Sequence, residues 1–397
     1  MSNKAATRRD FLKTTAKTIT SLGLGLSCSN AIAKNEVLKI GYLPITDASP
    51  ILIAYAKGFY QMEGIRVEKP LKIRNWSTLA ESFISQKFNL THLLFPIPVW
   101  MRFNNKFPIK VVALNHINGS AITVSHDSNI KSFKDLGGKQ IAVPHWYSMH
   151  NIILQMGLKK VGLKPVIQDQ SKKLKSDEVN LFILPPPDMP SSLVAKKIDG
   201  YIVAEPFNAL AELKIKAKIL RFTGDIWKNH PCCVVVMNEN FINYNPEFTQ
   251  KVVNAIVKAQ AWINKNPIET AKLLSRQGSN FLPVNTKTLV KVFTGYEKSI
   301  YGKGAIPQAI KHSDWAIKRI GFEPYPYPSA TRFIINEMRN TIVEGNTSFL
   351  TTLDTDKAIN ELVDDRFVKK AMLAYGINKF DSINIEDPWV REEIIEI

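Results

Sequence analysis

The side chains that could ligate a metal are few in this sequence. It contains seven histidines, at positions 92, 116, 126, 145, 150, 230 and 312, and adjacent cysteines at positions 232 and 233. Only His145 and His150 lie close together, and their spacing puts them on different faces of a helix. We therefore expect no dedicated zinc site and no cofactor. The cysteines indicate two small buried residues that begin a strand, and a strained bond between them is the alternative.

Motifs for catalysis and nucleotide binding are missing as well. The sequence has no P-loop, no Gly-x-Gly-x-x-Gly after a strand, no His-Glu-x-x-His, no Gly-x-Ser-x-Gly and no Cys-x-x-Cys. The acids expected near a cleft are Asp47, Asp188 and Glu205, too few to indicate general acid–base chemistry. The sequence therefore favours a binding protein without catalytic residues over an enzyme.

Short β-branched runs alternate with helical patterns and would position these side chains. We expect strands at residues 37–45, 91–95, 109–114, 139–143, 179–184 and 200–203, and helices at residues 49–62, 148–161 and 191–197. This alternation is typical of an α/β fold with largely parallel sheets. From about residue 246 the chain becomes helical, and a proline-rich connector at residues 324–329 precedes the last helical section.

Four of the expected strands end in loops rich in proline and in helix-capping residues. These loops are residues 44–50, 144–150, 185–190 and 204–208. Ligands of α/β proteins bind at the carboxyl ends of strands, where loops lead into helices. The free N–H groups and the positive dipole of a helix start suit a small anion. Four such loops in register favour a ligand site over stiff turns.

The first 33 residues have the three parts of an export signal. A basic segment with Arg8 and Arg9 precedes a weakly apolar middle and an Ala-x-Ala end at Ala33. The paired arginines resemble the twin-arginine type, and the middle is too short and polar to span a membrane. We expect cleavage after Ala33 and a free periplasmic protein. The alternative is processing at Cys28, which would leave a lipid anchor.

The chain is strongly basic, with 52 Lys and Arg against 35 Asp and Glu and a formal net charge of +17. Its lysines alternate with apolar residues instead of forming blocks, as they do on the solvated faces of amphipathic elements. A nucleic-acid groove is therefore the weaker interpretation, and we expect no nucleic-acid partner.

Several of the loops belong to longer motifs. They are GYLPITDASP at 41–50, LPPPDM at 184–189, GYIVAEPFN at 200–208 and IWKNHP at 226–231. In this order they resemble the nitrate/bicarbonate-binding family of ABC transporter substrate-binding proteins, within the nitrate/sulfonate/taurine group. The resemblance implies a two-lobed periplasmic-binding-protein fold of type II with extra C-terminal helices. It implies crossing strands at 121–125 and 232–237, with lobe 1 formed by residues 34–125 plus 226–397 and lobe 2 by residues 126–225.

The resemblance also implies a ligand site. Trp76 matches a tryptophan that walls the anion pocket, and His150 matches a pocket histidine. Ser120 replaces an amide, and Ala204 stands where a glycine is usual. Members of the family carry charged residues after the His-Pro pair, and one of these charged residues contacts the anion or a companion cation. This chain has Cys232 and Cys233 there instead. The expected ligand-binding residues are Thr46, Asp47, Trp76, Asn118, Ser120, His150, Ala204, Glu205 and Cys233.

The implied function is the exported solute-binding component of an ABC importer. Its solute would be a small anion such as nitrate, bicarbonate or a sulfonate, and its partners that anion and a membrane permease, with a monomeric chain. One alternative is a binding protein for a thiamine-pyrimidine precursor, in which Trp76, Trp146 and Tyr147 stack on a heterocycle. A pyrimidine-precursor synthase-like enzyme on the same fold and a sensor domain are further alternatives.

Overall fold

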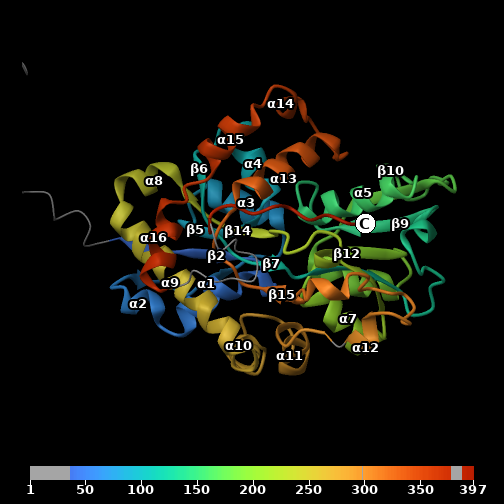
Figure 1. Ribbon diagram of the computed structural model, residues 1–397, viewed down its shortest axis with the longest axis horizontal. Helices are drawn as coiled ribbons and strands as arrows, with labels where there is room; N and C mark the ends of the chain where they lie inside the picture. The colour runs from blue at the N-terminus through green and yellow to red at the C-terminus, as the bar shows by residue number, and fades with distance from the viewer. Residues whose placement is uncertain (1–35, 297, 377–386) are drawn as a thin grey trace, which may run out of the picture. The chain divides into compact units, whose positions relative to one another are not determined.

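The computed structural model of the chain describes residues 36–296, 298–376 and 387–397. The expected export signal at residues 1–33 and Cys28 lie outside these residues. Strands and helices alternate through the described part, and two mixed sheets carry most of the strands (Figure 1). The predicted α/β class is therefore confirmed.

The first sheet is completed by a strand from much later in the chain. Its order is β4 (Leu71–Lys72), β2 (Ile40–Tyr42), β5 (Leu90–Leu94), β14 (Cys233–Asn238) and β6 (Ile109–Leu114). The strand β2 runs parallel to β4 and β5, whereas β14 runs antiparallel to both β5 and β6. The strand β14 lies between two neighbouring strands inside the sheet, and its β-branched run Val234–Val236 is fully buried.

The second sheet repeats this arrangement. Its order is β10 (Lys164–Val166), β11 (Glu178–Ile183), β9 (Lys139–Val143), β12 (Gly200–Ala204), β8 (Ser120–Val124) and β13 (Lys218–Phe222). The strand β8 is antiparallel to both of its neighbours, and the other pairs are parallel. Two short pairs complete the strands: β1 (Val37–Leu38) with β3 (Arg66–Val67), and β7 (Ile117–Asn118) with β15 (Ile320–Gly321).

The chain passes between the two sheets in two places. It leaves β6 and enters β8 through residues 115–119, and it leaves β13 and enters β14 through residues 223–232. The segments expected to cross, 121–125 and 232–237, overlap β8 and β14, so each lies largely within one sheet. The lobe boundaries inferred from the sequence stay a prediction.

Helices cover the sheets, and many of them begin at a capping side chain or at a proline. Those before the C-terminal section are α1 (Ser49–Ala56), α2 (Phe59–Met62), α3 (Trp76–Ile84), α4 (Pro96–Phe103), α5 (Met149–Lys160), α6 (Met189–Val194), α7 (Phe207–Ile215), α8 (Glu239–Tyr244), α9 (Pro246–Lys265), α10 (Pro267–Leu274), α11 (Thr286–Phe293) and α12 (Lys298–Tyr301). The long α9 buries Val252, Ile256 and Ile263 against α1, α2 and the C-terminal α16. None of the described helices is both long and apolar enough to cross a membrane.

The C-terminal section adds helices to the first sheet, as the resemblance implied. It contains α13 (Pro328–Asn340), α14 (Ser348–Thr351), α15 (Thr355–Leu362) and α16 (Arg366–Ala374), and both α15 and α16 pack against β6. The last residues also bind the second passage between the sheets. Lys228 N–H donates to Ile394 O at 3.0 Å, and Trp227 Nε1 donates to Glu393 Oε2 at 2.7 Å.

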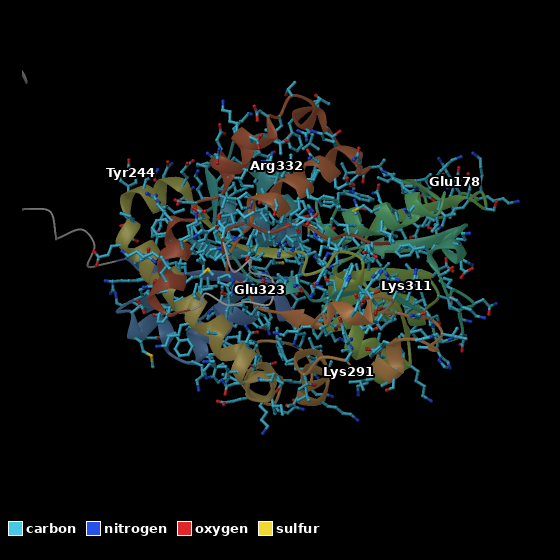
Figure 2. All side chains as sticks on the ribbon, in the orientation of Figure 1. Glu178, Tyr244, Lys291, Lys311, Glu323 and Arg332 are labelled. Carbon is cyan, nitrogen blue, oxygen red and sulfur yellow. The ribbon has the colours of Figure 1, made fainter. Side chains whose placement is uncertain are left out.

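Basic side chains are distributed over separate elements. Figure 2 labels Lys291 on α11, Lys311 in a loop and Arg332 on α13, each extending from a different part of the ribbon. Two of them are close to acids, since Lys291 Nζ lies 3.6 Å from Glu212 Oε1 and Arg332 pairs with Asp356. This arrangement agrees with the scattered lysines of the sequence.

Candidate ligand-binding site

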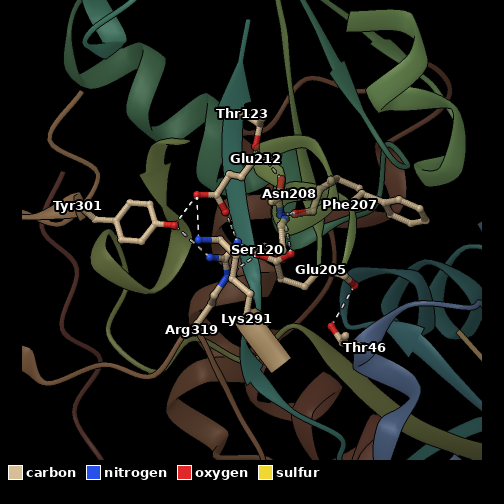
Figure 3. Close-up of polar contacts among 12 residues, drawn as sticks. Thr46, Ser120, Thr123, Glu205, Phe207, Asn208, Glu212, Lys291, Tyr301 and Arg319 are labelled. Atoms are coloured by element: carbon tan, nitrogen blue, oxygen red, sulfur yellow. Dashed lines mark hydrogen bonds and ion pairs between the residues drawn. The ribbon is translucent and has the colours of Figure 1, made fainter. Parts of the chain in front are cut away.

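Loops from the two sheets meet directly at Thr46 and Glu205. Thr46 follows β2 and Glu205 follows β12. The Thr46 N–H and its Oγ1 hydroxyl both donate to the Glu205 carbonyl oxygen, each at 2.9 Å (Figure 3). Both residues are fully buried. Two of the loops expected from the sequence, 44–50 and 204–208, are therefore joined.

A buried ion pair lies next to this contact. Asp47 Oδ2 is 3.0 Å from His116 Nε2, and both side chains are completely buried. Burial raises the pKa of Asp47, but the neighbouring imidazoles, His116 first, outweigh it and leave the pKa lowered. Burial lowers the pKa of His116, but Asp47 outweighs this and raises it to about 10. At neutral pH the pair is therefore a carboxylate and an imidazolium.

Both cysteines converge on the same carboxylate. Cys233 Sγ lies 3.2 Å from Asp47 Oδ2, and Cys232 Sγ lies 3.9 Å from it. Both thiols are buried and free, so the strained bond considered from the sequence is not formed in this structure. One ligand atom each of Asp47, His116, Cys232 and Cys233 lies within 4.8 Å of all the others. The histidine spacing alone could not indicate this cluster.

His150 lies close to this cluster, on the helix that follows β9 of the second sheet. It lies in the first turn of α5, which Ser148 caps by accepting from Asn151 N–H at 3.0 Å. His150 Nε2 is 2.9 Å from Ser120 Oγ, whereas no described residue makes a hydrogen bond with His150 Nδ1. Burial lowers the pKa of His150 to about 4, so the imidazole is neutral at pH 7.

Ser120 and His150 are as close as a catalytic serine and its general base, but the other features of a catalytic triad are not found among the described residues. An activated serine needs a base whose second nitrogen is oriented by a carboxylate, and a base pKa near the working pH. His150 Nδ1 lacks such a partner among the described residues, and its pKa is about 4. The arrangement therefore suits hydrogen bonding to a solute better than catalysis.

His92 belongs to the candidate site by its position, and sequence reasoning did not propose it. It lies within β5 and is fully buried, and its Nε2 accepts the Leu43 N–H at 3.1 Å. Burial lowers the pKa of His92 to about 4. A neutral imidazole that accepts at Nε2 carries its proton on Nδ1. Among the described residues, this Nδ1 has no hydrogen-bond partner, so its N–H is free to donate to a ligand.

Trp76 packs on this histidine. It begins α3, where the Asn75 side chain accepts from Thr78 N–H at 2.8 Å and caps the helix. The Trp76 and His92 rings meet edge to face, with centroids 5.5 Å apart. Trp76 is 1% exposed. It therefore lies beside His92, and its role in walling an anion pocket stays a prediction.

The carboxylate of Glu205 serves a different purpose from the one expected. Its Oε1 lies 2.6 Å from Arg319 Nη2 and 2.7 Å from Arg319 Nε, and its Oε2 accepts from Ala209 N–H at 3.0 Å. Arg319 also binds Glu212 at 2.8 Å, and Tyr301 donates to Glu212 (Figure 3). Only the Glu205 carbonyl therefore reaches Thr46. No local spacing in the sequence could point to Arg319.

The remaining expected residues have mainly structural contacts. Asn118 has a φ of 57°, and its side-chain amide donates to Lys318 O at 3.1 Å. Ala204 ends β12 opposite Ser120 of β8, which puts its methyl group next to the Ser120–His150 pair. In the expected loop 185–190, Asp188 pairs with Arg74, and both side chains are more than a third exposed. This pair joins the loop to the segment just before Trp76, at the surface.

Known proteins share the sequence pattern and the fold. The nitrate/nitrite binding protein NrtA of Nostoc sp. is 27% identical over 364 residues, which cover 85% of this chain and 77% of that protein. The bicarbonate transport ATP-binding protein CmpC of Synechocystis sp. is 25% identical over 254 residues, which cover 59% of this chain and 37% of that protein.

A solved structure shows the same fold. The crystal structure of the periplasmic nitrate-binding protein NrtA from Synechocystis PCC 6803 superposes with a TM-score of 0.69 at 20% identity, covering 86% of this chain and 89% of that one. The periplasmic-binding-protein fold expected from the sequence is thus confirmed. A sequence model of the NMT1-like family matches residues 32–275, and the chain belongs to that family.

Proposed function

We propose that this protein is the solute-binding component of an ABC importer and that it holds a small anion at the centre where the two sheets meet. One observation carries the proposal. Buried polar atoms converge from both sheets without hydrogen-bond partners among the described residues: Asp47 Oδ1, His92 Nδ1, Asn115 Oδ1 and His150 Nδ1. Buried polar groups are nearly always paired, so such a group of atoms marks a polar ligand site.

The N–H donors of this centre suit an acceptor, whereas Asp47 Oδ1 and Asn115 Oδ1 are themselves acceptors and need a donor, from water or from a protonated oxygen of the solute. His92 offers an N–H from its Nδ1, and His116 is an imidazolium beside Asp47. A planar oxyanion accepts such hydrogen bonds, which are strong when one partner is charged. Relatives named for nitrate and bicarbonate transport support this class of solute, and the choice among nitrate, bicarbonate and a sulfonate belongs to the experiment.

The heterocycle alternative finds less support. It needs the faces of Trp146 and Tyr147, but the Tyr147 ring stacks on Trp100 with centroids 5.6 Å apart and also contacts Phe349. One face of the Tyr147 ring is therefore already occupied by Trp100. The importer proposal brings with it a membrane permease as partner and a periplasmic location. The export signal predicted at residues 1–33 supports the location.

Thermal denaturation with single solutes tests the proposal. The purified protein, kept reduced and in chelator, is melted with nitrate, nitrite, bicarbonate, alkanesulfonates and a hydroxymethylpyrimidine. We expect one of the anions to raise the melting temperature, because a ligand that binds only the native state stabilises it. Stabilisation by the pyrimidine alone, or by none of the solutes, would overturn the anion proposal.

Two matched variants then place the solute. His92→Gln and His150→Gln each remove one imidazole from the centre, and we expect roughly ten-fold or greater loss of anion affinity by calorimetry. His126→Gln changes an exposed histidine and should bind as the unaltered protein does. Equal affinity in all three variants would exclude this centre as the binding site.

A further inference from the structure

We propose that Asp47, His116, Cys232 and Cys233 form a four-ligand site for a single Zn²⁺ ion. The inference goes beyond the proposed function, because it assigns a metal site to the centre whatever solute is bound there. It also reverses the expectation drawn from histidine spacing, which considered neither Asp47 nor the two cysteines as partners of His116.

The first support is the geometry of the ligand atoms. A carboxylate oxygen, an imidazole nitrogen and two sulfurs lie within 4.8 Å of one another. Zinc bonds of about 2.0 to 2.3 Å put the atoms of a tetrahedral site about 3.3 to 3.8 Å apart. The pair His116 Nε2–Asp47 Oδ2 at 3.0 Å and the pair Cys233 Sγ–Asp47 Oδ2 at 3.2 Å are already that close. Shifts of about 1 Å would bring all four atoms onto one ion.

The second support is that backbone hydrogen bonds hold the ligand segments in place. Cys232 N–H donates to His116 O at 3.4 Å, and Asn115 N–H donates to Cys233 O at 2.9 Å. The Asn115 side chain also donates to the backbone carbonyl of Asp47. Gln260 in turn donates to Asn115 O at 2.9 Å. Outer contacts that orient metal ligands in this way contribute strongly to metal affinity.

The third support is the direction of the two cysteines. Adjacent residues of a regular strand point to opposite faces. Here β14 begins only at Cys233, and Cys232 lies before it, so both sulfurs are directed at the Asp47 carboxylate. All four ligand residues are fully buried, and Asp47 Oδ1 has no hydrogen-bond partner among the described residues. Burial of this many polar groups is costly unless something binds them.

The mixture of ligands points to zinc among the thiophilic metals. Thiolates favour Zn²⁺ and Cu⁺, whereas a carboxylate oxygen suits the harder divalent ion. A site with two sulfurs, one nitrogen and one oxygen is an ordinary ligand set for four-coordinate zinc. Calcium and magnesium take oxygen ligands, so two sulfurs exclude them here.

Metal titration of the whole chain tests this inference. The protein is reduced, stripped with chelator and titrated with Zn²⁺ in competition with a chromophoric chelator. We expect one ion per chain, bound with release of protons from the His116 imidazolium and from the cysteine thiols to the buffer, because zinc takes neutral imidazole and thiolate ligands. Co²⁺ in place of zinc should give thiolate-to-cobalt charge-transfer bands and the intense visible bands of tetrahedral cobalt. A cobalt spectrum without charge-transfer bands would overturn the site, even if some zinc binds elsewhere.

Single substitutions locate the ion. Cys232→Ser, Cys233→Ser and His116→Gln should each lower zinc affinity by roughly a hundred-fold or more, since even outer contacts cost ten- to a hundred-fold. Cys28→Ser changes the third cysteine of the chain and should leave affinity unchanged. Unaltered binding in both Cys232→Ser and Cys233→Ser would refute the proposal.

The outcome is separate from that of the importer proposal. Anion binding is measured in chelator, so loss of zinc binding leaves it standing. Circular dichroism of each variant shows whether it folds, and the cobalt spectrum of the unaltered protein decides the question if a variant does not. A cobalt spectrum free of thiolate bands together with a bond between Cys232 and Cys233 in the purified protein would assign the cysteines to redox chemistry instead.

Discussion

The ion pair between Asp47 and His116 sets the character of the buried centre at the scale of single residues. It is fully buried, yet it lies among imidazoles that burial keeps neutral, His92 and His150. One fixed carboxylate and one fixed imidazolium thus stand among neutral donors and acceptors. Such a centre is close to neutral overall, so hydrogen bonds rather than net charge select what binds there.

Removing one member of the pair should destabilise the fold. We expect Asp47→Asn to lower the free energy of unfolding by about 3 kcal/mol, because it leaves His116 without its partner in a buried place. Urea denaturation in chelator at pH 7 measures the loss. Adding His116→Gln to Asp47→Asn should cost much less than the sum of the two changes. Strict additivity would show that the pair does not act as a unit.

A surface pair provides the comparison. Asp188 and Arg74 form an ion pair in which both side chains are more than a third exposed. Exposed pairs contribute little, because water and salt screen them. Asp188→Asn should therefore change the free energy of unfolding by less than about 1 kcal/mol. If Asp188→Asn lowered the free energy of unfolding as much as Asp47→Asn, burial would not be what makes the Asp47–His116 pair strong.

The buried neutral histidines predict sensitivity to acid. His145 is half-buried, and its partial removal from water lowers its pKa to about 4, against about 6.5 in an unfolded chain. Between these values the unfolded chain binds more protons, so stability is complete above pH 6.5 and falls as the pH drops toward 4. Each such histidine contributes a slope of about 1.4 kcal/mol per pH unit.

Urea denaturation between pH 7 and pH 5 checks this slope. His145→Gln should make it shallower, whereas His126→Gln, at an exposed position, should not change it. If the slope of His145→Gln equals that of the unaltered protein, His145 is not held neutral by its surroundings.

Helix starts position the site at the scale of elements. The cap Ser148 begins α5 and presents His150, and the cap Asn75 begins α3 and presents Trp76. Each capping side chain binds a backbone N–H three residues later, which fixes the direction of the first helical turn. The aromatic and imidazole groups of the centre are therefore held by rigid elements and not by free loops.

This role can be separated from stability alone. Asn75→Ala should cost about 1 kcal/mol of unfolding free energy, the usual loss for a helix cap. Because Trp76 follows directly and contacts His92, we also expect weaker anion binding by calorimetry. Asn285 caps α11 by the same contact, with Thr288 N–H at 2.9 Å. Asn285→Ala should lose similar stability and keep full affinity, and equal affinity in both variants would contradict a positioning role for Asn75.

Patterns local in sequence predicted the elements well. The expected strands 109–114 and 139–143 match β6 and β9, because β-branched apolar runs bounded by turns have few other solutions. The expected strand 37–45 and helix 49–62 are each divided in the structure, at Lys39 and at Lys57 and Gly58. Such breaks depend on tertiary contacts and leave little trace in a periodic pattern.

The site was predicted only in part, for a similar reason. The strand-end rule brought together loops 44–50 and 204–208, and it also included loop 185–190, whose Asp188 makes an exposed ion pair with Arg74. His92 resembles a core histidine because it lies inside an apolar strand, and nothing but its neighbours distinguishes it. Arg319 lies far along the chain from Glu205, so no local spacing relates the two.

At the scale of the whole molecule, the two sheets have the same arrangement of strands. Each has parallel strands and one antiparallel strand, β14 in the first and β8 in the second, next to a passage between the sheets. The buried centre lies where these passages start and end, at residues 115–120 and 230–233. Any change in the relation of the two sheets therefore acts directly on the centre.

The net charge of +17 leads to a prediction for the whole molecule. Basic side chains extend from separate elements, and several are paired with acids (Figure 2). We therefore expect duplex DNA to bind only through non-specific electrostatic attraction, with a dissociation constant of roughly micromolar or weaker at physiological salt. Fluorescence anisotropy with a labelled duplex measures this. Tight binding that survives an increase in salt would show a dedicated groove.

The insertion of β14 between β5 and β6 has a consequence for the order of folding. During synthesis, β5 and β6 are complete long before residues 233–238 leave the ribosome. Until then these two strands lack the neighbour that joins them, and each presents an open edge of the kind that promotes aggregation. The same late strand brings Cys233 to Asp47. The proposed binding centre and the first sheet are therefore completed in one step, so we expect a chain that has not finished folding to lack this centre.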